Sequence, residues 1–491
     1  MTTAGHGLSS LILLPVLGCL ACLLFGRTLT AARIIVGSGG LFLAALSWIL
    51  MGAFGHLYPY PSVDLAWIPS WGARIQLAAD PLGLSLAGLS ALLVAFAAFE
   101  KRGLLEASPR GASAALFLLL TALNGVFLAR DLLLFFFFWE LTLIPMLILI
   151  GRWGGERRLY AAKLFFLFTM AGSALMLAGI VGLGLEQASG GGGAGFSLDQ
   201  LARLGLDPAK QAFFFWCFFI AFAVKVPVFP LHSWLPIAHV EAPTVGSMLL
   251  AGVLLKMGGF GFIRILLPLF PDAAAHFGPL AAALGCAGVV YGSLAALGQG
   301  DMKRLVALSS VGHLGVATAA LFAGTPQAIE GGAFILISHG VASAGLFYMV
   351  GLVYGRYHTR EMARLGGVAK ALPDLAAAGF ILVLAGIGAP LTCGFVGEFL
   401  AILGTYTRSP LVSAVLCSGV VLSAVYFLSA YQKVFLGTSR GDAHHVESLS
   451  WSERTPLFAL AALSLILGLW PEAVLGPIRA SLLALGSQVL P

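Results

Sequence analysis

The chain has 491 residues, of which 59% are hydrophobic and only 10% are charged. Ordinary globular domains contain about 25% charged residues, so this composition excludes a soluble globular protein and indicates an integral membrane protein. The formal net charge of +6 follows from how Lys and Arg are shared between loops, and it does not require a nucleic-acid-binding surface.

Apolar stretches long enough to cross a hydrocarbon core of roughly 30 Å recur along the whole chain. We expect an all-α polytopic membrane protein with about fourteen transmembrane helices and no soluble domain between them. The stretches lie at residues 9–26, 34–54, 82–99, 112–129, 132–151, 159–184, 211–236, 243–268, 275–297, 305–323, 328–355, 375–401, 410–432 and 456–478.

Two of these stretches contain residues that interrupt a helix. In "FFIAFAVKVPVFPLHSW", Pro227 and Pro230 follow Lys225 closely, and proline removes a backbone donor from the helix. In "AGIGAPLTCGFVGE", which ends at Glu398, the helix is weakened by Gly386, Gly388, Pro390 and Gly394. Paired broken helices in corresponding places of two halves are typical of transporter cores built from inverted repeats.

This pairing predicts the organisation of the chain. Residues 112–270 and 271–436 are expected to form two five-helix repeats, each with its broken helix in fourth place. Because each unit has an odd number of spans, the second repeat is expected to be inverted relative to the first. Residues 1–111 would supply three preceding helices, and residues 437–491 a loop and a C-terminal helix.

Lys and Arg fall unevenly between the two sets of alternating loops. One set holds seventeen of them and the other only seven, and the positive-inside rule makes the richer side cytoplasmic. An even helix count then places both termini on the opposite side, outside the cytoplasm. The poorer set consists of Arg74, Arg130, Arg203, Lys210, Arg264, Arg408 and Arg479.

Several ionisable residues lie deep within the expected spans. Lys256 is about thirteen residues into its helix, roughly 20 Å from the near end, so its side chain cannot reach the interface. An unpaired charge at that depth costs at least about 2.5 to 3.5 kcal/mol on insertion scales, and Lys256 therefore indicates a functional site. Glu140, Lys225 and Glu398 are deep by the same criterion, whereas Lys163 is close enough to an interface to bend towards it.

Histidines and serines extend this series. His232, His313 and His339 lie in or beside spans, and a single histidine of this kind can equally be a packing residue. The neighbouring Glu and Lys residues favour a functional role for His313 and His339, because such groups exchange protons. Four serines can hold bridging waters or simply pack helices; they are Ser309, Ser310, Ser338 and Ser343.

The segment "PLHSWLPIAHVEAPTVGSMLLAGVLLKMGGFGFIR" resembles the signature of the antiporter-like subunits of respiratory complex I, the proton-translocating NADH:quinone oxidoreductase. Related signatures occur in multisubunit sodium/proton antiporters and membrane-bound hydrogenases. "FFFFWELTLIPM", "GDMKRLVALSSVGHLG" and "GFVGEFLAILG" resemble the M type, or mitochondrial subunit 4 type, which carries glutamate in its second broken helix. The resemblance covers nearly the whole chain. It departs at Ile237, where the family usually has a charged or polar residue.

The resemblance implies a proton path through this chain, driven by redox chemistry in other subunits. It implies that FMN, iron–sulfur clusters and quinone are held by partner subunits, with no cofactor or metal on this chain. The partners would include antiporter-like L-type and N-type subunits and the lipid bilayer. The implied roles are Glu140 and Lys225 as the pair of the first half-channel, Lys256 as the central lysine, His313 and His339 as linking histidines, and Glu398 as the terminal residue.

Three alternatives remain open at this point. A subunit of a sodium/proton antiporter or hydrogenase would share the lysines and broken helices, a structural subunit would have lost transport, and a substrate transporter would have a polar solute pocket.

Two other sequence motifs give only weak evidence for a binding site. The glycine run 189–195 lacks the lysine of a phosphate-binding loop and is expected to be an external loop, and His444 and His445 are expected to be solvated rather than metal-binding.

Overall fold

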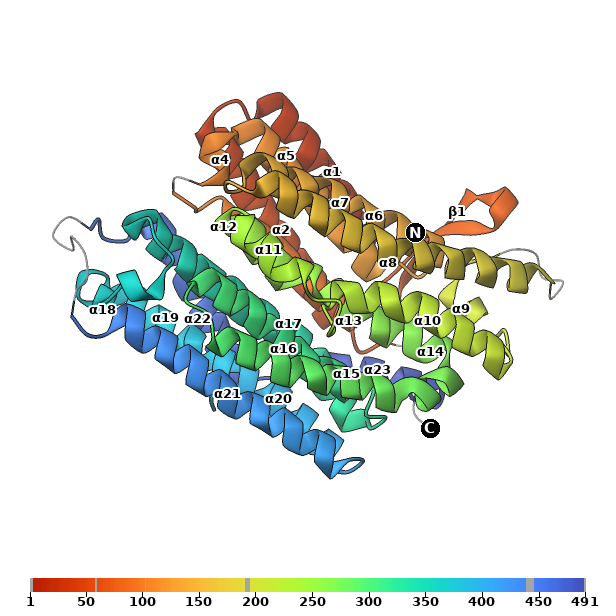
Figure 1. The fold of residues 1–491 in the computed structure, drawn as a ribbon. Helices are drawn as coiled ribbons and strands as arrows, with labels where there is room; N and C mark the ends of the chain where they lie inside the picture. The colour runs from red at the N-terminus through yellow and green to blue at the C-terminus, as the bar shows by residue number, and fades with distance from the viewer. Residues whose placement is uncertain (1–2, 58–59, 102, 190–194, 439–445, 490–491) are drawn as a thin grey trace.

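The structure is a computed structural model that describes residues 3–57, 60–101, 103–189, 195–438 and 446–489. Most of the expected glycine loop and both His444 and His445 lie outside these residues. Within them, long helices run side by side along one common direction, and a short β-hairpin lies at one end of the bundle (Figure 1). The chain is therefore the polytopic helical bundle that its composition predicts.

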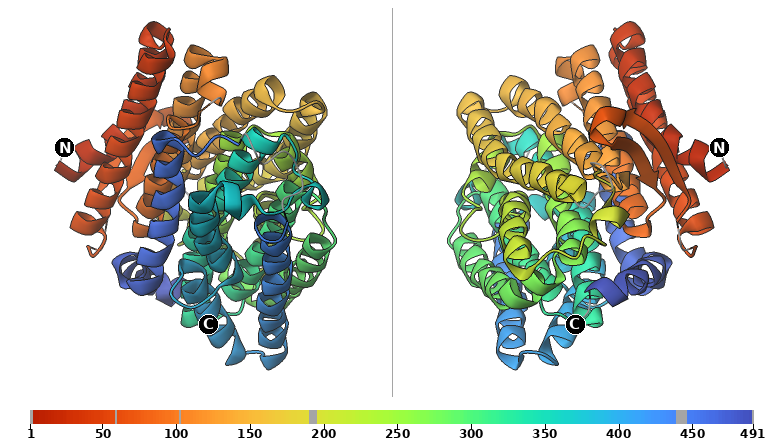
Figure 2. Two further views of the ribbon diagram at one scale, coloured as in Figure 1. Left: turned by 90° about the vertical axis from the view of Figure 1, so that its left-hand side faces the viewer. Right: turned by 90° about the vertical axis from the view of Figure 1, so that its right-hand side faces the viewer.

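The N-terminal region consists of three long helices and one short one. The first two, α1 (Thr3–Phe25) and α2 (Leu29–Phe54), lie at the outer edge of the bundle (Figure 2). By contrast, α3 (Pro81–Ala97) is buried along almost its entire length. The short α4 (Leu104–Ala107) follows it. Thus α3 belongs to the interior although it precedes the first expected repeat.

The β-hairpin is an addition to the all-helical architecture expected from the sequence. Its strands β1 (Ser62–Ile68) and β2 (Ala73–Ala78) pair antiparallel. The turn η1 (Pro69–Trp71) joins them, and Gly72 ends this turn with φ 68°. These residues suit the turn, because the proline ring fixes φ at its start and glycine accepts the left-handed backbone conformation at its end.

The first expected repeat begins with helices that cross the bundle in alternation, and its fourth member is broken. Lys225 ends α10 and Trp234 begins α11, so the interruption predicted after Lys225 is confirmed. The elements are α5 (Pro109–Leu128), α6 (Leu132–Leu141), α7 (Leu143–Trp153), α8 (Arg158–Gln187), α9 (Leu198–Leu201), α10 (Pro208–Lys225) and α11 (Trp234–Glu241).

A segment that we call the central helix completes this repeat. The sequence suggested a regular helix here, but the structure contains two π-helical turns, one on each side of the turn that begins with Lys256. The central helix consists of α12 (Thr244–Leu249), η3 (Leu250–Leu254), α13 (Lys256–Gly261), η4 (Phe262–Leu266) and α14 (Leu267–Leu269).

The second expected repeat also has its broken helix in fourth place. Ile387 ends α19 and Cys393 begins α20, which confirms the second predicted interruption. The elements are α15 (Pro271–Leu297), α16 (Met302–Leu321), α17 (Pro326–Tyr357), η5 (Met362–Arg364), α18 (Val368–Ala371), α19 (Pro373–Ile387), α20 (Cys393–Tyr406) and α21 (Pro410–Phe435). The inversion of the two repeats stays a prediction.

The C-terminal region departs from the expected single span at 456–478. The structure has two helices there, α22 (Trp451–Leu469) and α23 (Glu472–Val489). Trp470 leaves the helical region with φ −133° and ψ 65°, and Pro471 cannot donate a helical hydrogen bond. By length and composition, 11 described helices can cross a membrane; the three remaining expected spans correspond to α3 and the two broken helices.

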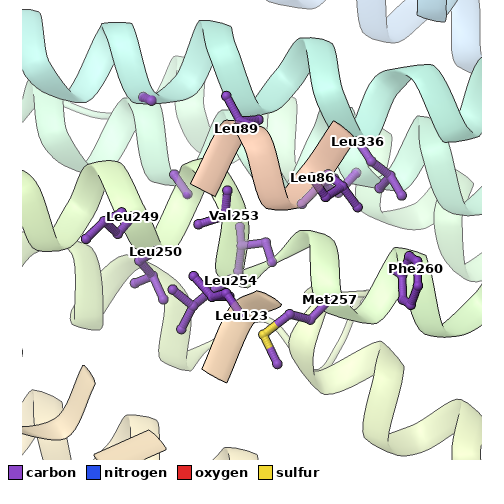
Figure 3. Close-up of a cluster of buried hydrophobic side chains, with 14 of the residues drawn as sticks. Leu86, Leu89, Leu123, Leu249, Leu250, Val253, Leu254, Met257, Phe260 and Leu336 are labelled. Atoms are coloured by element: carbon purple, nitrogen blue, oxygen red, sulfur yellow. The ribbon is translucent and has the colours of Figure 1, made fainter. Parts of the chain in front are cut away.

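The core of the bundle surrounds the central helix. The membrane-crossing windows of the central helix and of α17 are completely buried, and in Figure 1 the central helix lies between the helices of the two repeats. Figure 3 shows apolar side chains from four parts of the chain around it. They include Leu86 and Leu89 of α3, Leu123 of α5, Leu336 of α17, and Val253 and Met257 of the central helix itself.

Candidate functional site

Four of the predicted residues form one connected series of neighbours in the core. The Nζ atom of Lys256 lies 2.7 Å from Nδ1 of His339, and Nδ1 of His313 lies 2.7 Å from Oε1 of Glu398. The ring centroids of the two histidines are 5.8 Å apart. These residues come from α13, α17, α16 and α20, and we call Lys256, His339, His313 and Glu398 the polar axis.

The π-helical turn η3 helps to hold Lys256. The N–H of Leu255 bonds to the carbonyl of Leu250, five residues back, so it does not occupy the carbonyl of Ala251 as it would in an α-helix. The ammonium group of Lys256 donates to this Ala251 carbonyl. Lys256 is 0% exposed, and it therefore has two polar partners inside an otherwise apolar core.

Gly340 allows α17 to approach the central helix closely enough for this contact. A Cβ atom at Gly340 would lie 2.7 Å from the carbonyl oxygen of Gly252 and 3.5 Å from Cε of Lys256. Because the first distance is shorter than real Cβ contacts, a side chain at this position would push the two helices apart. The adjacent His339 would then move away from Lys256.

The second break places Glu398 at the other end of the polar axis. Gly388 leaves α19 with φ 74°, and Leu391 also has a positive φ of 73°. A Cβ atom on Gly388 would lie 2.4 Å from Oε2 of Glu398, so the carboxylate lies directly against the break. The Tyr426 hydroxyl is 3.4 Å from Nε2 of His313 and adds a polar group beside this end.

Glu140 and Lys225 form a separate group with a different environment. The Nζ atom of Lys225 has no hydrogen-bond partner among the described residues. Instead it lies 5.1 Å from the ring centroid of Trp139 and 5.6 Å from that of Phe165, where the ring faces attract a cation. Glu140 interacts with Lys225 electrostatically, but no ion pair within 4.0 Å joins these two described residues.

Backbone packing brings the first break next to the central helix. A Cβ atom at Gly258 would lie 2.5 Å from the carbonyl oxygen of Phe222 and 2.6 Å from Cγ2 of Val226. Gly258 is two residues from Lys256, and Phe222 and Val226 flank Lys225. The two lysines therefore lie in neighbouring segments whose backbones are in close contact, although only Lys256 belongs to the polar axis.

The other histidine and serine candidates from the sequence have surroundings that indicate packing more than proton transfer. His232 is buried between Phe229 and Tyr291, with ring centroids 5.5 and 4.8 Å away, and it is not in the polar axis. Ser309 and Ser310 donate to the carbonyl of Val306 in their own helix, which is the packing role weighed above.

Two buried polar residues have no role in the sequence-based interpretation. His239 in α11 is completely buried, and neither ring nitrogen has a hydrogen-bond partner among the described residues. Lys303, one of the seventeen basic residues that the sequence places in the richer set of loops, is also buried, and its Nζ donates to the Ala242 carbonyl at 2.5 Å. The positions of both in charged or polar motifs, "WLPIAHVEAP" and "GDMKRL", gave no sign of burial.

The structure corrects the assignment of Arg264 to a loop. It lies in η4 and is 4% exposed, and its Nη2 donates to Oδ1 of Asp80 at 2.6 Å. Asp80 also caps α3 by accepting from the N–H groups of Leu82 and Gly83. Arg264 is therefore neutralised within the fold, and its position says little about the side of the membrane.

The described residues contain no group of three or more His, Cys, Asp or Glu side chains arranged to hold a metal ion. What the site does contain is a series of groups that bind and release protons. Lysine, histidine and glutamate side chains are each able to carry a proton and to pass it to a neighbour within hydrogen-bond reach. The chemistry available to this arrangement is therefore proton transfer.

Residues 129–424 match the model of the family described as NADH:quinone oxidoreductase/Mrp antiporter, transmembrane. The chain is 38% identical over 488 residues to NADH-quinone oxidoreductase subunit M of Pseudomonas aeruginosa, covering 96% of each chain. It is also 38% identical over 419 residues to subunit M of Escherichia coli, covering 84% of this chain and 82% of that one.

Solved structures agree with this relationship. A chain of respiratory complex I from Thermus thermophilus with bound NADH matches with a TM-score of 0.88 and 32% identity, over 99% of this chain and 100% of that chain. A chain of the Mrp complex from Dietzia matches with a TM-score of 0.83 and 20% identity, over 99% and 98%, which is a likeness of fold. The chain therefore belongs to the NADH:quinone oxidoreductase/Mrp antiporter family of membrane proteins, among relatives that are M subunits of complex I.

Proposed function

We propose that this chain is the M-type antiporter-like subunit of an NADH:quinone oxidoreductase and that it carries protons along its buried ionisable residues. The observation that carries the proposal is the polar axis, which runs from Lys256 to Glu398 through two histidines. An isolated buried lysine is explained by packing or a chance partner. Four proton-exchanging groups from four different helices, each next to another member of the series, are better explained by transfer.

The geometry supports a stepwise transfer. A proton on Nζ of Lys256 passes to Nδ1 of His339 across 2.7 Å, and His339 releases a proton from its other nitrogen. Rotation of the rings or a water molecule carries it to His313, since the ring centroids are 5.8 Å apart. His313 then passes a proton to Glu398 across 2.7 Å. Only N–H and O–H bonds form and break.

The pair of Glu140 and Lys225 is proposed to control this transfer electrostatically. A unit charge at about 4 Å contributes roughly 4 kcal/mol at an effective dielectric constant of 20. Among the described residues, Lys225 has no hydrogen-bond partner that holds its ammonium group in place, so this group is free to move towards Glu140 or away from it. Closing the pair would remove a positive field from the neighbourhood of Lys256 and so change its affinity for a proton.

The proposal includes the surroundings of the chain. Other membrane subunits of the complex are its partners, and we place L-type and N-type antiporter-like subunits among them. FMN, iron–sulfur clusters and quinone would belong to partner subunits that perform the redox chemistry. We further place the chain in the bacterial inner membrane, with both termini on the periplasmic side because the opposite loops are richer in Lys and Arg.

The test is NADH-driven proton uptake in inside-out membrane vesicles, with quinone reduction followed in parallel. In the assembled complex, Lys256→Ala and Glu140→Ala should each lower the number of protons moved per electron, and Ile237→Ala serves as the control. Unchanged proton-to-electron ratios in both variants would show that these charges are structural. Replacing sodium by choline distinguishes the antiporter alternative, because a sodium-coupled subunit would lose activity.

A further inference from the structure

A cavity of about 650 Å³ lies at one end of the bundle, where the ends of several helices meet. Pro271 begins α15, Leu321 ends α16, and Val412 lies in the first turn of α21, and all three line the cavity. The lining continues inwards along α15 to Ala282, roughly 16 Å from Pro271 at 1.5 Å per residue. The volume is within the range of small-molecule binding sites.

The cavity lies at the outside of the bundle and extends from the headgroup layer of a membrane into its hydrocarbon. Helix α21 runs along the edge of the bundle (Figure 1), and only 33% of its membrane-crossing window is buried, compared with 44% for α15. The 27 residues of α15 span roughly 40 Å, about the thickness of a bilayer with its headgroups. A cavity that begins at the end of α15 therefore has a polar mouth and a hydrocarbon-facing interior.

The walls of the cavity are mostly apolar, whereas its mouth has one charged side chain of each sign. Arg408 and Asp272 both line the cavity and are exposed. Among the described residues, neither has an ion-pair partner within 4.0 Å. Oδ2 of Asp272 accepts from Nε2 of Gln211 at 2.8 Å, and a carboxylate has further acceptor sites. The mouth therefore suits a ligand with a negative and a positive group close together, attached to an apolar chain.

Two hydroxyl groups beside Arg408 add donors for the negative group. Thr405 lines the cavity and is 1% exposed, and its Oγ1 has no hydrogen-bond partner among the described residues. A helical threonine commonly donates to a carbonyl one turn back, as Thr318 does, so the unpartnered Thr405 indicates a missing acceptor. The Ser409 hydroxyl accepts from the N–H of Val412 and keeps its own hydrogen to donate.

We infer that this cavity binds phosphatidylethanolamine. Arg408 pairs with the phosphate, because a guanidinium group donates two parallel hydrogen bonds to phosphate oxygens, and Ser409 donates to the same phosphate. Thr405 donates to an ester oxygen of the glycerol, Asp272 accepts from the ammonium group, and one acyl chain follows α15 inwards. Phosphatidylglycerol has no amine for Asp272, and phosphatidylcholine has no N–H to donate. The inference goes beyond the proposed function and does not depend on proton transfer.

Photocross-linking in the assembled complex tests this site. The probe is phosphatidylethanolamine with a diazirine on one acyl chain, and mass spectrometry identifies the labelled peptides. We expect labelling within residues 271–297 and 410–435. Unlabelled phosphatidylethanolamine should suppress it at a severalfold lower concentration than phosphatidylcholine or phosphatidylglycerol does. Equal competition by all three lipids would show an ordinary contact with the bilayer and overturn the inference, and so would the absence of labelling in these segments.

Substitutions at the mouth test the two halves of the headgroup separately. Arg408→Gln should reduce labelling severalfold, and Asp272→Asn should let phosphatidylglycerol compete as well as phosphatidylethanolamine. An unchanged preference in Asp272→Asn would overturn recognition of the amine. Arg304→Gln is the matched control, because Arg304 is an exposed arginine at the other end of α16 without an ion pair in the described part of the chain.

A second variant keeps the test valid if Arg408→Gln does not assemble. Thr405→Val preserves the shape of the side chain and removes a hydroxyl that has no partner among the described residues, so the complex should assemble normally. Labelling should fall severalfold, and wild-type labelling in this variant and in Arg408→Gln would overturn the site. The ratio of protons to electrons should stay at the wild-type value in Thr405→Val, so this result and the test of the proposed function are independent.

Discussion

The two broken helices use the same backbone device but surround their ionisable residues differently. At the first break, Lys225 ends a helix and has aromatic rings beside it, and it has no hydrogen-bond partner in the part of the chain that the structure describes. At the second, Glu398 lies within a helix, against Gly388, and shares a short hydrogen bond with His313. Interrupting a helix thus creates room for a charge, whereas the neighbouring helices decide whether that charge is free to move or is connected to others.

The difference suggests that the two breaks have different roles in proton transfer. A lysine without hydrogen bonds can shift between positions with little loss, so the first break suits a moving charge that acts through its field. A carboxylate bonded to histidine suits the transfer of protons. Three changes test this contrast, and a fourth, with the smallest expected effect, concerns a carboxyl group outside both breaks.

Glu398→Gln should have the largest effect. It removes the only carboxylate of the polar axis while keeping the size of the side chain, so the proton from His313 has no acceptor. We expect NADH-driven proton uptake to fall roughly tenfold or more, the low end of what one acid–base group contributes. Glu106→Gln, on the exposed face of α4, is the control, and equal uptake by the two variants would contradict a transfer role for the second break.

Gly388→Ala should reduce proton uptake severalfold and also lower stability. The new Cβ strains a backbone at φ 74° and meets Oε2 of Glu398, which must move away from His313. Gly324→Ala separates these effects, because Gly324 has φ 73° but open space around it. Both variants should lower the melting temperature of the complex, because an alanine in the left-handed region costs about 1–2 kcal/mol of folding free energy. Only Gly388→Ala should also impair proton uptake.

Trp139→Phe should have a moderate effect confined to the first break. The smaller ring attracts a cation less strongly, and the loss amounts to roughly 0.5–2 kcal/mol. It also frees the Ser173 hydroxyl that accepts from the indole at 3.1 Å. We expect about a twofold change in the rate of proton uptake without uncoupling, measured beside Trp216→Phe as a control of similar bulk. A tenfold loss would mean that Lys225 is held in place rather than free.

The smallest expected effect concerns Glu100, a partly buried carboxyl group outside the membrane-crossing segments. Because its pKa is raised from 4.5 to about 7, the neutral carboxyl favours the folded state. This contribution is present in full below about pH 4.5 and is lost as the pH rises through about 7. The positive groups that face it are Lys303 and Arg33. Glu100→Gln should therefore flatten the fall in melting temperature between pH 5 and pH 8, and an unchanged slope would contradict the raised pKa.

Much of the architecture was predictable because its causes are local. Apolar length predicts which segments cross a membrane, and the prolines after Lys225 and the glycines before Glu398 predict the two breaks. The depth of Lys256 follows from counting residues along one helix. The boundary at Trp470 and Pro471 was also marked locally, although the expected span ran through it.

Other features depend on which helices are neighbours. His339 is 83 residues from Lys256, and Glu398 is 85 residues from His313, so neither contact follows from spacing along the chain. The same holds for the burial of Lys303 and for the pairing of Arg264 with Asp80, 184 residues away.

The sequence by itself determined the membrane class, the two interruptions and the set of deep ionisable residues, because hydrophobic length and backbone chemistry act over a few residues. Only the tertiary structure decided that Lys256 contacts His339 and that, among the described residues, Lys225 and the buried His239 have no hydrogen-bond partners. These outcomes depend on close backbone approach at glycines such as Gly340 and Gly258. Packing between helices far apart in sequence sets such distances, and hydrogen bonding is sensitive to a few tenths of an ångström.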